Sequence, residues 1–299
     1  MRKPLIIALA IALSGCSQSP DARSITISQD QVRSISLDTT GRFTASRVVV
    51  LANGVAEIMQ SLNAQSIIVG RDISSTEKSL EDIPIVTSGH QILPEKVISL
   101  KPDLVLIDAS SGPQSAIQQI EKSGVRVVKI PESWTLADIE VKVAAVGAAI
   151  GASQQAQILI EKLNQSLAQS QIEKQLRIAF LYLRGTSSVY LIGGSGSGAD
   201  SIFASLGAVD VGAQQLKNPF NTLTAESLAA LNPDVIVVMS KGLESVGGVD
   251  GLLKLPGVGQ TKAGKDSAII DVDDSLLLSF GPRTPSLIEQ LRIALNELL

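Results

Sequence analysis

One residue near the end of an apolar run could bind a metal through oxygen, and a second could stabilise its ionised form. Tyr182 and Arg184 are two residues apart, so strand alternation places both side chains on one face. A nearby guanidinium favours the phenolate over the phenol, and a phenolate is a good oxygen donor for ferric iron. The same pattern also fits a core tyrosine whose neighbouring arginine extends to solvent, so the spacing alone leaves both roles open.

His90 is the only histidine of the 299 residues. It lies in the segment Thr87-Ser-Gly-His-Gln, just before a helix that we expect to begin near Glu95. Loops at the carboxyl ends of strands are where open α/β sheets bind ligands, and this segment is expected in such a loop. A single loop histidine is more often an ordinary surface residue, so position alone does not decide its role.

Short apolar runs alternate with helical stretches over most of the chain, as in α/β proteins whose parallel strands are buried on both faces. The expected strands are 48–51, 66–69, 104–107, 125–130, 178–183, 235–239 and 268–272. The expected helices are 53–62, 94–100, 114–123, 199–206, 225–231 and 285–298. This order predicts two Rossmann-like α/β lobes, each built around a parallel central sheet.

A stretch without proline joins the two halves. Between Thr135 and about Ser170, apolar residues recur at nearly helical spacing. We therefore expect one long backbone helix over 135–172, bent near Gly147 or Gly151. The N-terminal lobe is then expected over 46–134 and the C-terminal lobe over 173–299.

An internal repeat indicates that the lobes are built alike. The segment Glu95–Ile107 aligns without gaps on Glu226–Val238, with Glu, Leu, Pro and Asp at matching positions. Each copy predicts a short helix with a glutamate in its first turn, stopped by Pro-Asp and followed by a buried strand. An ordinary helix–strand unit does not require all four matches.

The first residues have the order of a secretion signal. Arg2 and Lys3 precede an apolar run over 5–13 that is too short to span a bilayer. The following Leu-Ser-Gly-Cys16 resembles a bacterial lipobox, which implies removal of residues 1–15 and a lipid on Cys16. We expect an extracytoplasmic, lipid-anchored protein, with 16–45 as a spacer that contains one weak strand near 24–27. Cys16 is the only cysteine, so an internal disulfide is excluded.

Composition and motifs favour a binding protein over an enzyme or a nucleic-acid binder. The 44% hydrophobic and 18% charged residues are typical of a folded globular chain. A formal net charge of -4, without a basic cluster in the mature region, argues against a nucleic-acid partner. The glycine-rich stretch 193–198 matches neither a dinucleotide loop nor a nucleophile elbow. The single histidine precedes these serines in the chain, whereas the hydrolase order Ser, Asp, His requires it to follow them. A zinc site with several His and Cys ligands is not expected either, because the chain has one histidine and its one cysteine would carry the lipid.

With these features together, the whole mature chain resembles the class III, or helical-backbone, solute-binding proteins of bacterial ABC importers. The resemblance implies a ligand held between the lobes, with permease and ATPase subunits as partners; we expect the protein itself to be a monomer. Glu95 and Glu226 match the positions that dock onto permease arginines in that family. Each glutamate would also complement the dipole of its own helix.

Within the family, several segments are similar to the haem carriers: 69–76, 182–185, 196–201, 247–252 and 281–285. The resemblance implies haem as the transported ligand. It assigns His90 and Tyr182 as axial ligands of the iron, and Arg184 as the partner of the Tyr182 phenolate.

Further residues are candidates for contacts to the rest of the haem. Arg71 and Arg283 follow strand ends in opposite lobes, and either could form a charge-assisted fork with a propionate. Met239 could line the cleft near the iron or fill a gap in the core. Trp134 and Tyr190 could contact the porphyrin or simply pack.

The same fold carrying a siderophore or cobalamin is the closest alternative. A siderophore pocket would be expected to have more aromatic and basic lining, whereas aromatic residues make up only 3% of this chain. A haem-linked sensor or adhesion module is a third alternative, but no additional domain supports it.

Overall fold

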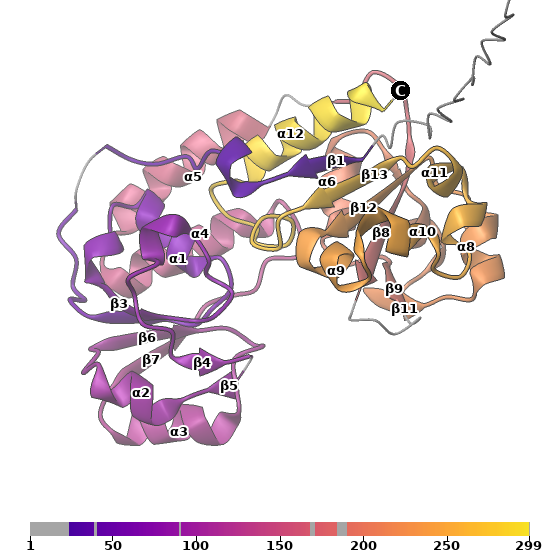
Figure 1. The fold of residues 1–299 in the computed structure, drawn as a ribbon. Helices are drawn as coiled ribbons and strands as arrows, with labels where there is room; N and C mark the ends of the chain where they lie inside the picture. The colour runs from indigo at the N-terminus through magenta and orange to yellow at the C-terminus, as the bar shows by residue number, and fades with distance from the viewer. Residues whose placement is uncertain (1–23, 39–40, 90, 168–170, 184–189, 299) are drawn as a thin grey trace, which may run out of the picture.

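A computed structural model describes residues 24–38, 41–89, 91–167, 171–183 and 190–298, and it has two α/β lobes (Figure 1). The N-terminal lobe contains a parallel sheet with the strand order β3 (Ile68–Arg71), β2 (Val48–Val50), β6 (Leu104–Ile107) and β7 (Arg126–Lys129). Helix α1 (Val55–Ser61) packs on one face, and α2 (Pro94–Ser99) and α3 (Gln114–Lys122) cover the other. A short hairpin of β4 (Thr87–Ser88) and β5 (Gln91–Ile92) lies beside this sheet.

The C-terminal lobe has a larger, mixed sheet. Its order is β1 (Ile25–Ile27), β13 (Ile269–Val272), β12 (Val235–Met239), β8 (Arg177–Leu183), β9 (Tyr190–Gly193) and β11 (Phe220–Thr222), and β10 (Val209–Asp210) also pairs with β8. Strand β9 is antiparallel to both of its neighbours, β8 and β11, so the sheet that was expected to be parallel has an antiparallel edge. Helices α6 (Ala199–Ser205) and α12 (Thr284–Glu297) pack on one face, and α8 (Ala225–Leu231), α10 (Gly248–Leu253) and α11 (Lys262–Lys265) cover the other.

The remaining elements are short and were not expected from the sequence. They are α7 (Val211–Gln215), α9 (Ser240–Ser245), and the 3-10 turns η1 (Gln29–Gln31), η2 (Gln65–Ile67), η3 (Lys78–Leu80) and η4 (Val258–Gln260). None of the helices in the described ranges has the length and apolar character needed to cross a membrane.

The expected helix over 135–172 is instead two helices, α4 (Asp138–Ile150) and α5 (Ser153–Leu167). Gly151 ends α4 in the left-handed conformation, with φ of 80°, which turns the chain back. The Asn164 side chain donates to Glu140 over 2.5 Å, so α5 runs antiparallel to α4. A Cβ on Gly147 would lie only 2.4 Å from that of Ala156, so a glycine permits this close approach. The sequence suggested one helix because both helices bury an apolar face in the same core, so the helical spacing of apolar residues continues on both sides of the turn.

The weak strand expected near 24–27 is confirmed as β1, but the described residues from 24 onward do not form a spacer. Strand β1 pairs with β13, with Ile25 opposite Ile270, in the sheet of the C-terminal lobe. The chain then crosses to the N-terminal lobe, where the Leu37 amide donates to the Ser61 carbonyl and Leu37 is buried. This stretch is therefore part of the folded body and links the two lobes; residues 16–23 lie outside the described ranges.

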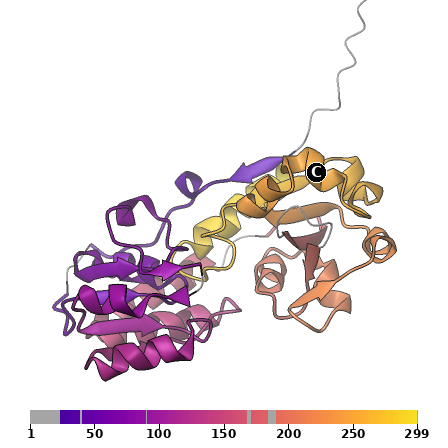
Figure 2. The same ribbon diagram turned by 60° about the horizontal axis from the view of Figure 1, so that its bottom comes forward.

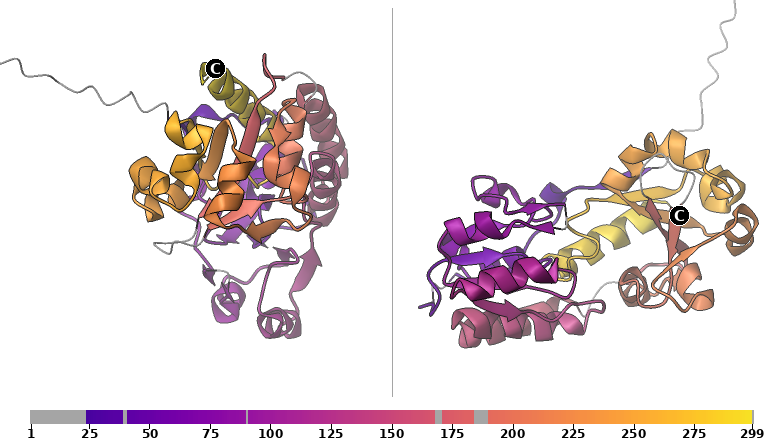
Figure 3. Two further views of the ribbon diagram at one scale, coloured as in Figure 1. Left: turned by 90° about the vertical axis from the view of Figure 1, so that its right-hand side faces the viewer. Right: turned by 90° about the horizontal axis from the view of Figure 1, so that it is seen from below.

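One hydrophobic core runs through both lobes. It contains side chains from the first sheet, such as Val48 and Leu106, and from the second, such as Phe180 and Ile270. The views in Figures 2 and 3 show α12 and the chain around β1 extending between the lobes along one side of the molecule. The two lobes are thus packed against each other rather than joined by a single linker.

The internal repeat has a structural explanation. Arg47 begins the approach to β2, and its guanidinium donates to the carbonyl of Leu100 over 2.6 Å, while its backbone amide donates to Asp103. In the other lobe, Arg177 donates to the Leu231 carbonyl over 2.8 Å, and its amide donates to Asp234. The matching leucine and aspartate therefore fasten one helix–strand unit to the neighbouring strand in each lobe.

A buried ionic cluster lies where the lobes meet. Arg283, at the start of α12, places Nε 3.0 Å from a carboxylate oxygen of Glu57 on α1 and Nη2 3.1 Å from Glu77. Glu57 is 1% exposed and Arg283 is 6% exposed. Burial raises the pKa of Glu77, and the Arg283 charge opposes that rise. Arg283 therefore holds two buried carboxylates of the N-terminal lobe against the C-terminal lobe.

Replacing Arg283 with Met should reduce the free energy of unfolding by about 3–5 kcal/mol, because Glu57 and Glu77 would lose their cation. Denaturant unfolding followed by circular dichroism measures this loss. The matched control is Arg292→Met, since Arg292 pairs with Glu289 on the more exposed face of the same helix. A loss for Arg283→Met no greater than for the control would contradict the role of the cluster.

Candidate ligand-binding site

A cavity of about 720 Å³ lies between the two lobes. The N-terminal lobe contributes residues that follow β2, β3, β6 and β7, and the C-terminal lobe contributes residues of β8, β9, β11 and β12 and of the loop after β13. Ligands of open α/β sheets bind outside the carboxyl ends of the strands, and this volume lies within the usual range of ligand pockets.

Aromatic and aliphatic side chains form much of the wall. Tyr182 and Phe220 come from different strands of the C-terminal lobe, with ring centroids 5.5 Å apart and planes tilted by 55°. Trp134 and Ile73 line the opposite lobe, and they are 41% and 47% exposed, respectively. Large apolar side chains exposed toward a cavity mark a surface that an apolar ligand would cover.

Two loops of identical pattern hold the N-terminal rim of the cavity. Asp72-Ile-Ser-Ser75 follows β3, and Asp108-Ala-Ser-Ser111 follows β6. The Asp108 carboxylate accepts hydrogen bonds from the amides and hydroxyls of Ser110 and Ser111 and from the Asn53 amide, at 2.8–3.0 Å. Asp72 accepts in the same way from Ser74 and Ser75. Both loops are fixed by these bonds.

A related loop holds the C-terminal rim. Asp273, after β13, accepts from the amide and hydroxyl of Ser275 at 2.9 and 2.7 Å. Burial alone would raise the pKa of Asp273, but the hydrogen bonds from Ser275 and Gln29 and the charge of Lys241 lower it overall. Ser275 lines the cavity, so Asp273 fixes a residue of the cavity wall.

The structure brings two of the expected site residues into the cavity wall. Tyr182 is half-buried on β8, and Met239 ends β12 beside it in the same sheet. His90, Arg184 and Cys16 lie outside the described residues; the neighbour of His90, Gly89, lines the cavity. Of the two aromatic residues left open, Trp134 lines the cavity, whereas Tyr190 is buried and donates its hydroxyl to the Pro256 carbonyl over 2.6 Å.

The two arginines expected to pair with propionates have other partners. Arg71 is buried, and its guanidinium donates to the carbonyls of Ser75, Leu80 and Ile83 at 2.8–3.1 Å, so it closes the loop after β3. Arg283 is held in the ionic cluster with the two glutamates. Neither lines the cavity, because each guanidinium compensates buried acceptors of the protein itself.

Glu95 and Glu226 are exposed in the first turns of α2 and α8, at matching places in the two lobes. The Glu95 carboxylate accepts from the Gln119 side chain over 3.1 Å. A hydrogen bond from its own backbone and the side chain of Thr224 lower the pKa of Glu226.

Sequence reasoning missed several residues of the cavity wall, notably Phe220 and Lys241. Phe220 lies on an antiparallel strand of three residues that has no apolar run of its own. The paired Asp-x-Ser-Ser loops were detectable, since each follows a buried strand directly. Within the described ranges, no group of three His, Cys, Asp or Glu side chains could hold a metal ion.

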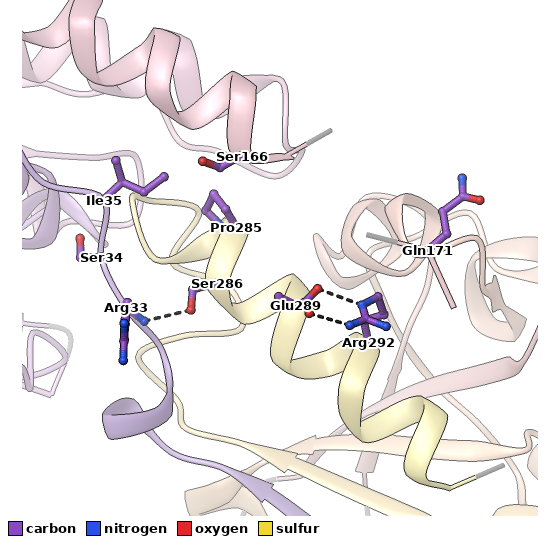
Figure 4. A pocket seen from close by; sticks show the side chains of 9 residues that line it. All are labelled: Arg33, Ser34, Ile35, Ser166, Gln171, Pro285, Ser286, Glu289 and Arg292. Carbon is purple, nitrogen blue, oxygen red and sulfur yellow. Dashed lines mark hydrogen bonds and ion pairs between the residues drawn. The ribbon is translucent and has the colours of Figure 1, made fainter. Parts of the chain in front are cut away.

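A second hollow of about 600 Å³ lies between α12, the end of α5 and residues 33–35 (Figure 4). Its wall combines Arg33 and neighbouring residues with α12, where Arg292 pairs with Glu289 at 2.6 Å. It is not formed by the carboxyl ends of strands, so we assign the ligand site to the cavity between the lobes.

Two α/β lobes that enclose a cavity at their strand ends define a two-lobed solute-binding protein. The chain belongs to the periplasmic binding protein family, whose model matches residues 48–276. It is 26% identical to the uncharacterized ABC transporter substrate-binding lipoprotein YvrC of Bacillus subtilis, over 96% of this chain and 93% of that protein.

Solved structures of haem-binding proteins are similar over most of the chain. An alanine variant of the haem-binding protein HmuT has a TM-score of 0.79 and 31% identity, with 95% of this chain and 96% of that chain covered. The periplasmic haem-binding protein RhuT from Roseiflexus sp. RS-1 has a TM-score of 0.80 and 32% identity, covering 85% and 99%. The similar HmuT structures include variants in which an arginine, a histidine or a tyrosine is replaced by alanine.

Replacing Asp108 with Asn should lower the free energy of unfolding by about 1–3 kcal/mol. The Asp108 carboxylate now accepts hydrogen bonds on both oxygens from Asn53, Ser110 and Ser111, and an amide NH2 group in place of one oxygen could not accept them. Denaturant unfolding measures the change, and the exposed Asp250→Asn on α10 is the control. Equal stability of the two variants would mean that the loop does not depend on this carboxylate.

Proposed function

We propose that this protein binds haem outside the cytoplasm and delivers it to an ABC importer. The observation that carries the proposal is the position of Tyr182, whose phenol lies in the wall of a largely apolar cavity between the lobes. A flat, apolar macrocycle with a central iron suits such a cavity, because the wall can cover the ring while the phenol reaches the metal.

The relatives support this choice of ligand. The similar solved structures HmuT and RhuT are described as haem-binding proteins, and they cover 95% and 85% of this chain, respectively. In the HmuT variants, the replaced tyrosine and arginine are two positions apart, as Tyr182 and Arg184 are in this chain. A histidine is replaced in a further variant, which agrees with a role for His90.

The proposed iron ligands come from both lobes. Tyr182, on β8 of the C-terminal lobe, would bind one side of the iron as a phenolate, and the Arg184 guanidinium would favour that ionised form. His90, which follows the cavity-lining Gly89 in the N-terminal lobe, would bind the other side. Met239 and Phe220 would contact the porphyrin beside the tyrosine.

The proposed location rests on Cys16, and the proposed partners rest on two exposed glutamates. A lipid on Cys16 would anchor the protein to the outer face of the cytoplasmic membrane. Glu95 and Glu226 would meet arginines of the permease, because both are exposed at equivalent places on the two lobes. A monomer would present one such pair to the importer.

Titration with haemin should produce a shifted Soret band and charge-transfer bands typical of tyrosinate ligation. Tyr182→Phe should abolish the charge-transfer bands because the oxygen donor is lost, and His90→Ala should change the spectrum without removing them. Tyr190→Phe is the matched control, since the Tyr190 hydroxyl is bonded to Pro256 away from the cavity.

A spectrum identical to that of free haemin would refute the haem assignment and leave a siderophore or cobalamin as the ligand of the same fold. If haemin binds but Tyr182→Phe retains the charge-transfer bands, haem remains the ligand and the tyrosine is not bound to its iron.

The double variant Glu95→Ala and Glu226→Ala should lose haem-dependent growth of cells while binding haemin with unchanged affinity. Both carboxylates lie on the outer surface rather than in the cavity wall, so only docking should suffer. Exposed Glu121 and Glu297, replaced together, form the control. Reduced haemin affinity in the Glu95 and Glu226 variant would contradict a docking role.

A further inference from the structure

A small side chamber of about 100 Å³ adjoins the main cavity. The two spaces share five lining residues, which are Asn53, Asp108, Ser110, Trp134 and Leu278. The chamber lies at the carboxyl ends of β2, β6 and β7 in the N-terminal lobe, and Leu278 covers it from the C-terminal lobe. Its volume is on the order of three water molecules at liquid density, which suits a short side group of a ligand.

Lys142, on α4, contributes its side chain to this chamber. The residue is only 3% exposed, and its ammonium donates one hydrogen bond within the described ranges, to the Ser279 carbonyl over 2.8 Å. An ammonium group has three hydrogens to donate, so this contact leaves donor capacity for a group that enters the chamber.

The ammonium has no ion pair with any carboxylate of the described residues. The acidic groups that face it are Glu57, Asp108 and Glu132. Glu57 pairs with Arg283, Asp108 accepts from its own loop, and Glu132 is exposed and accepts from the Trp134 indole over 3.3 Å. These carboxylates are engaged elsewhere, so the buried cation is only partly compensated.

Burial accordingly lowers the pKa of Lys142 to about 8, although the three carboxylates oppose the shift. The amine is therefore still protonated at neutral pH. A carboxylate entering the chamber would supply the missing counter-charge and a hydrogen-bond acceptor in one group.

We propose that the side chamber is a carboxylate subsite, in which Lys142 binds an acidic side group of the ligand. This inference rests on the proposed function, and for haem the acidic group is one propionate. The porphyrin edge that carries this propionate would face the N-terminal lobe. Lys142 would thereby take the part that the sequence suggested for Arg71 and Arg283.

The test measures the affinities of the wild-type protein and of Lys142→Met for haemin and for its dimethyl ester, in which both propionates are neutral. Lys142→Met should weaken haemin binding on the order of 10- to 100-fold, since a charged hydrogen bond is lost. The same variant should bind the ester as wild type does. Lys162→Met, exposed on the adjoining helix α5, is the matched control and should leave both affinities unchanged.

A second measurement needs no variant and so does not depend on whether Lys142→Met folds. Haemin affinity of the wild-type protein should fall as the pH rises above about 8, where free Lys142 loses its proton, whereas affinity for the ester should not follow this change.

Equal affinity of the wild-type protein for haemin and its ester would overturn the subsite. Equal weakening of both ligands by Lys142→Met would also overturn it, because the lysine would then act only through its contact with Ser279. If the wild-type protein binds no haemin at all, both the proposed function and the subsite fail.

Discussion

The contact between the two lobes is the constraint on which the cavity depends. Arg283 joins Glu57 and Glu77 in a buried cluster, and a single hydrophobic core continues from one lobe into the other around it. Buried carboxylates without a cation would be costly, so the cluster favours one arrangement of the lobes. The walls of the cavity belong to different lobes, and fixing the lobes therefore fixes the distance across the ligand space.

Each lobe contributes a similar framework but a different surface to that space. Arg47 and Arg177 fasten equivalent helix–strand units to the neighbouring strand in each lobe. The N-terminal lobe then adds rigid Asp-x-Ser-Ser loops with polar groups, whereas the C-terminal lobe adds the aromatic pair Tyr182 and Phe220. A ligand with an apolar face and a polar edge matches this division.

Three buried cations of the described residues have distinct electrostatic surroundings. Arg71 and Arg283 are satisfied by carbonyls and carboxylates of the protein, whereas Lys142 has one carbonyl and no ion pair among the described residues. Of these three, Lys142 has charge and donors left for an entering group. Lys142 lies on α4 of the N-terminal part of the molecule and donates to Ser279 in the loop after β13. Its contact therefore joins the wall of the chamber to the C-terminal lobe.

The sequence alone determined the α/β class and the two similar lobes, because buried strands and their ends leave a local apolar pattern; that Tyr182 and Met239 line the cavity was decided by the tertiary structure. The sequence did not predict the hairpin of α4 and α5, since helical spacing continues through Gly151, nor the packing of residues 24–38 and 41–45. Only the tertiary structure decided which charged groups line the cavity and its side chamber. Charge marks a residue as polar, but its partners come from distant segments: Arg283 meets Glu57 across 226 positions, while Lys142 reaches the chamber wall.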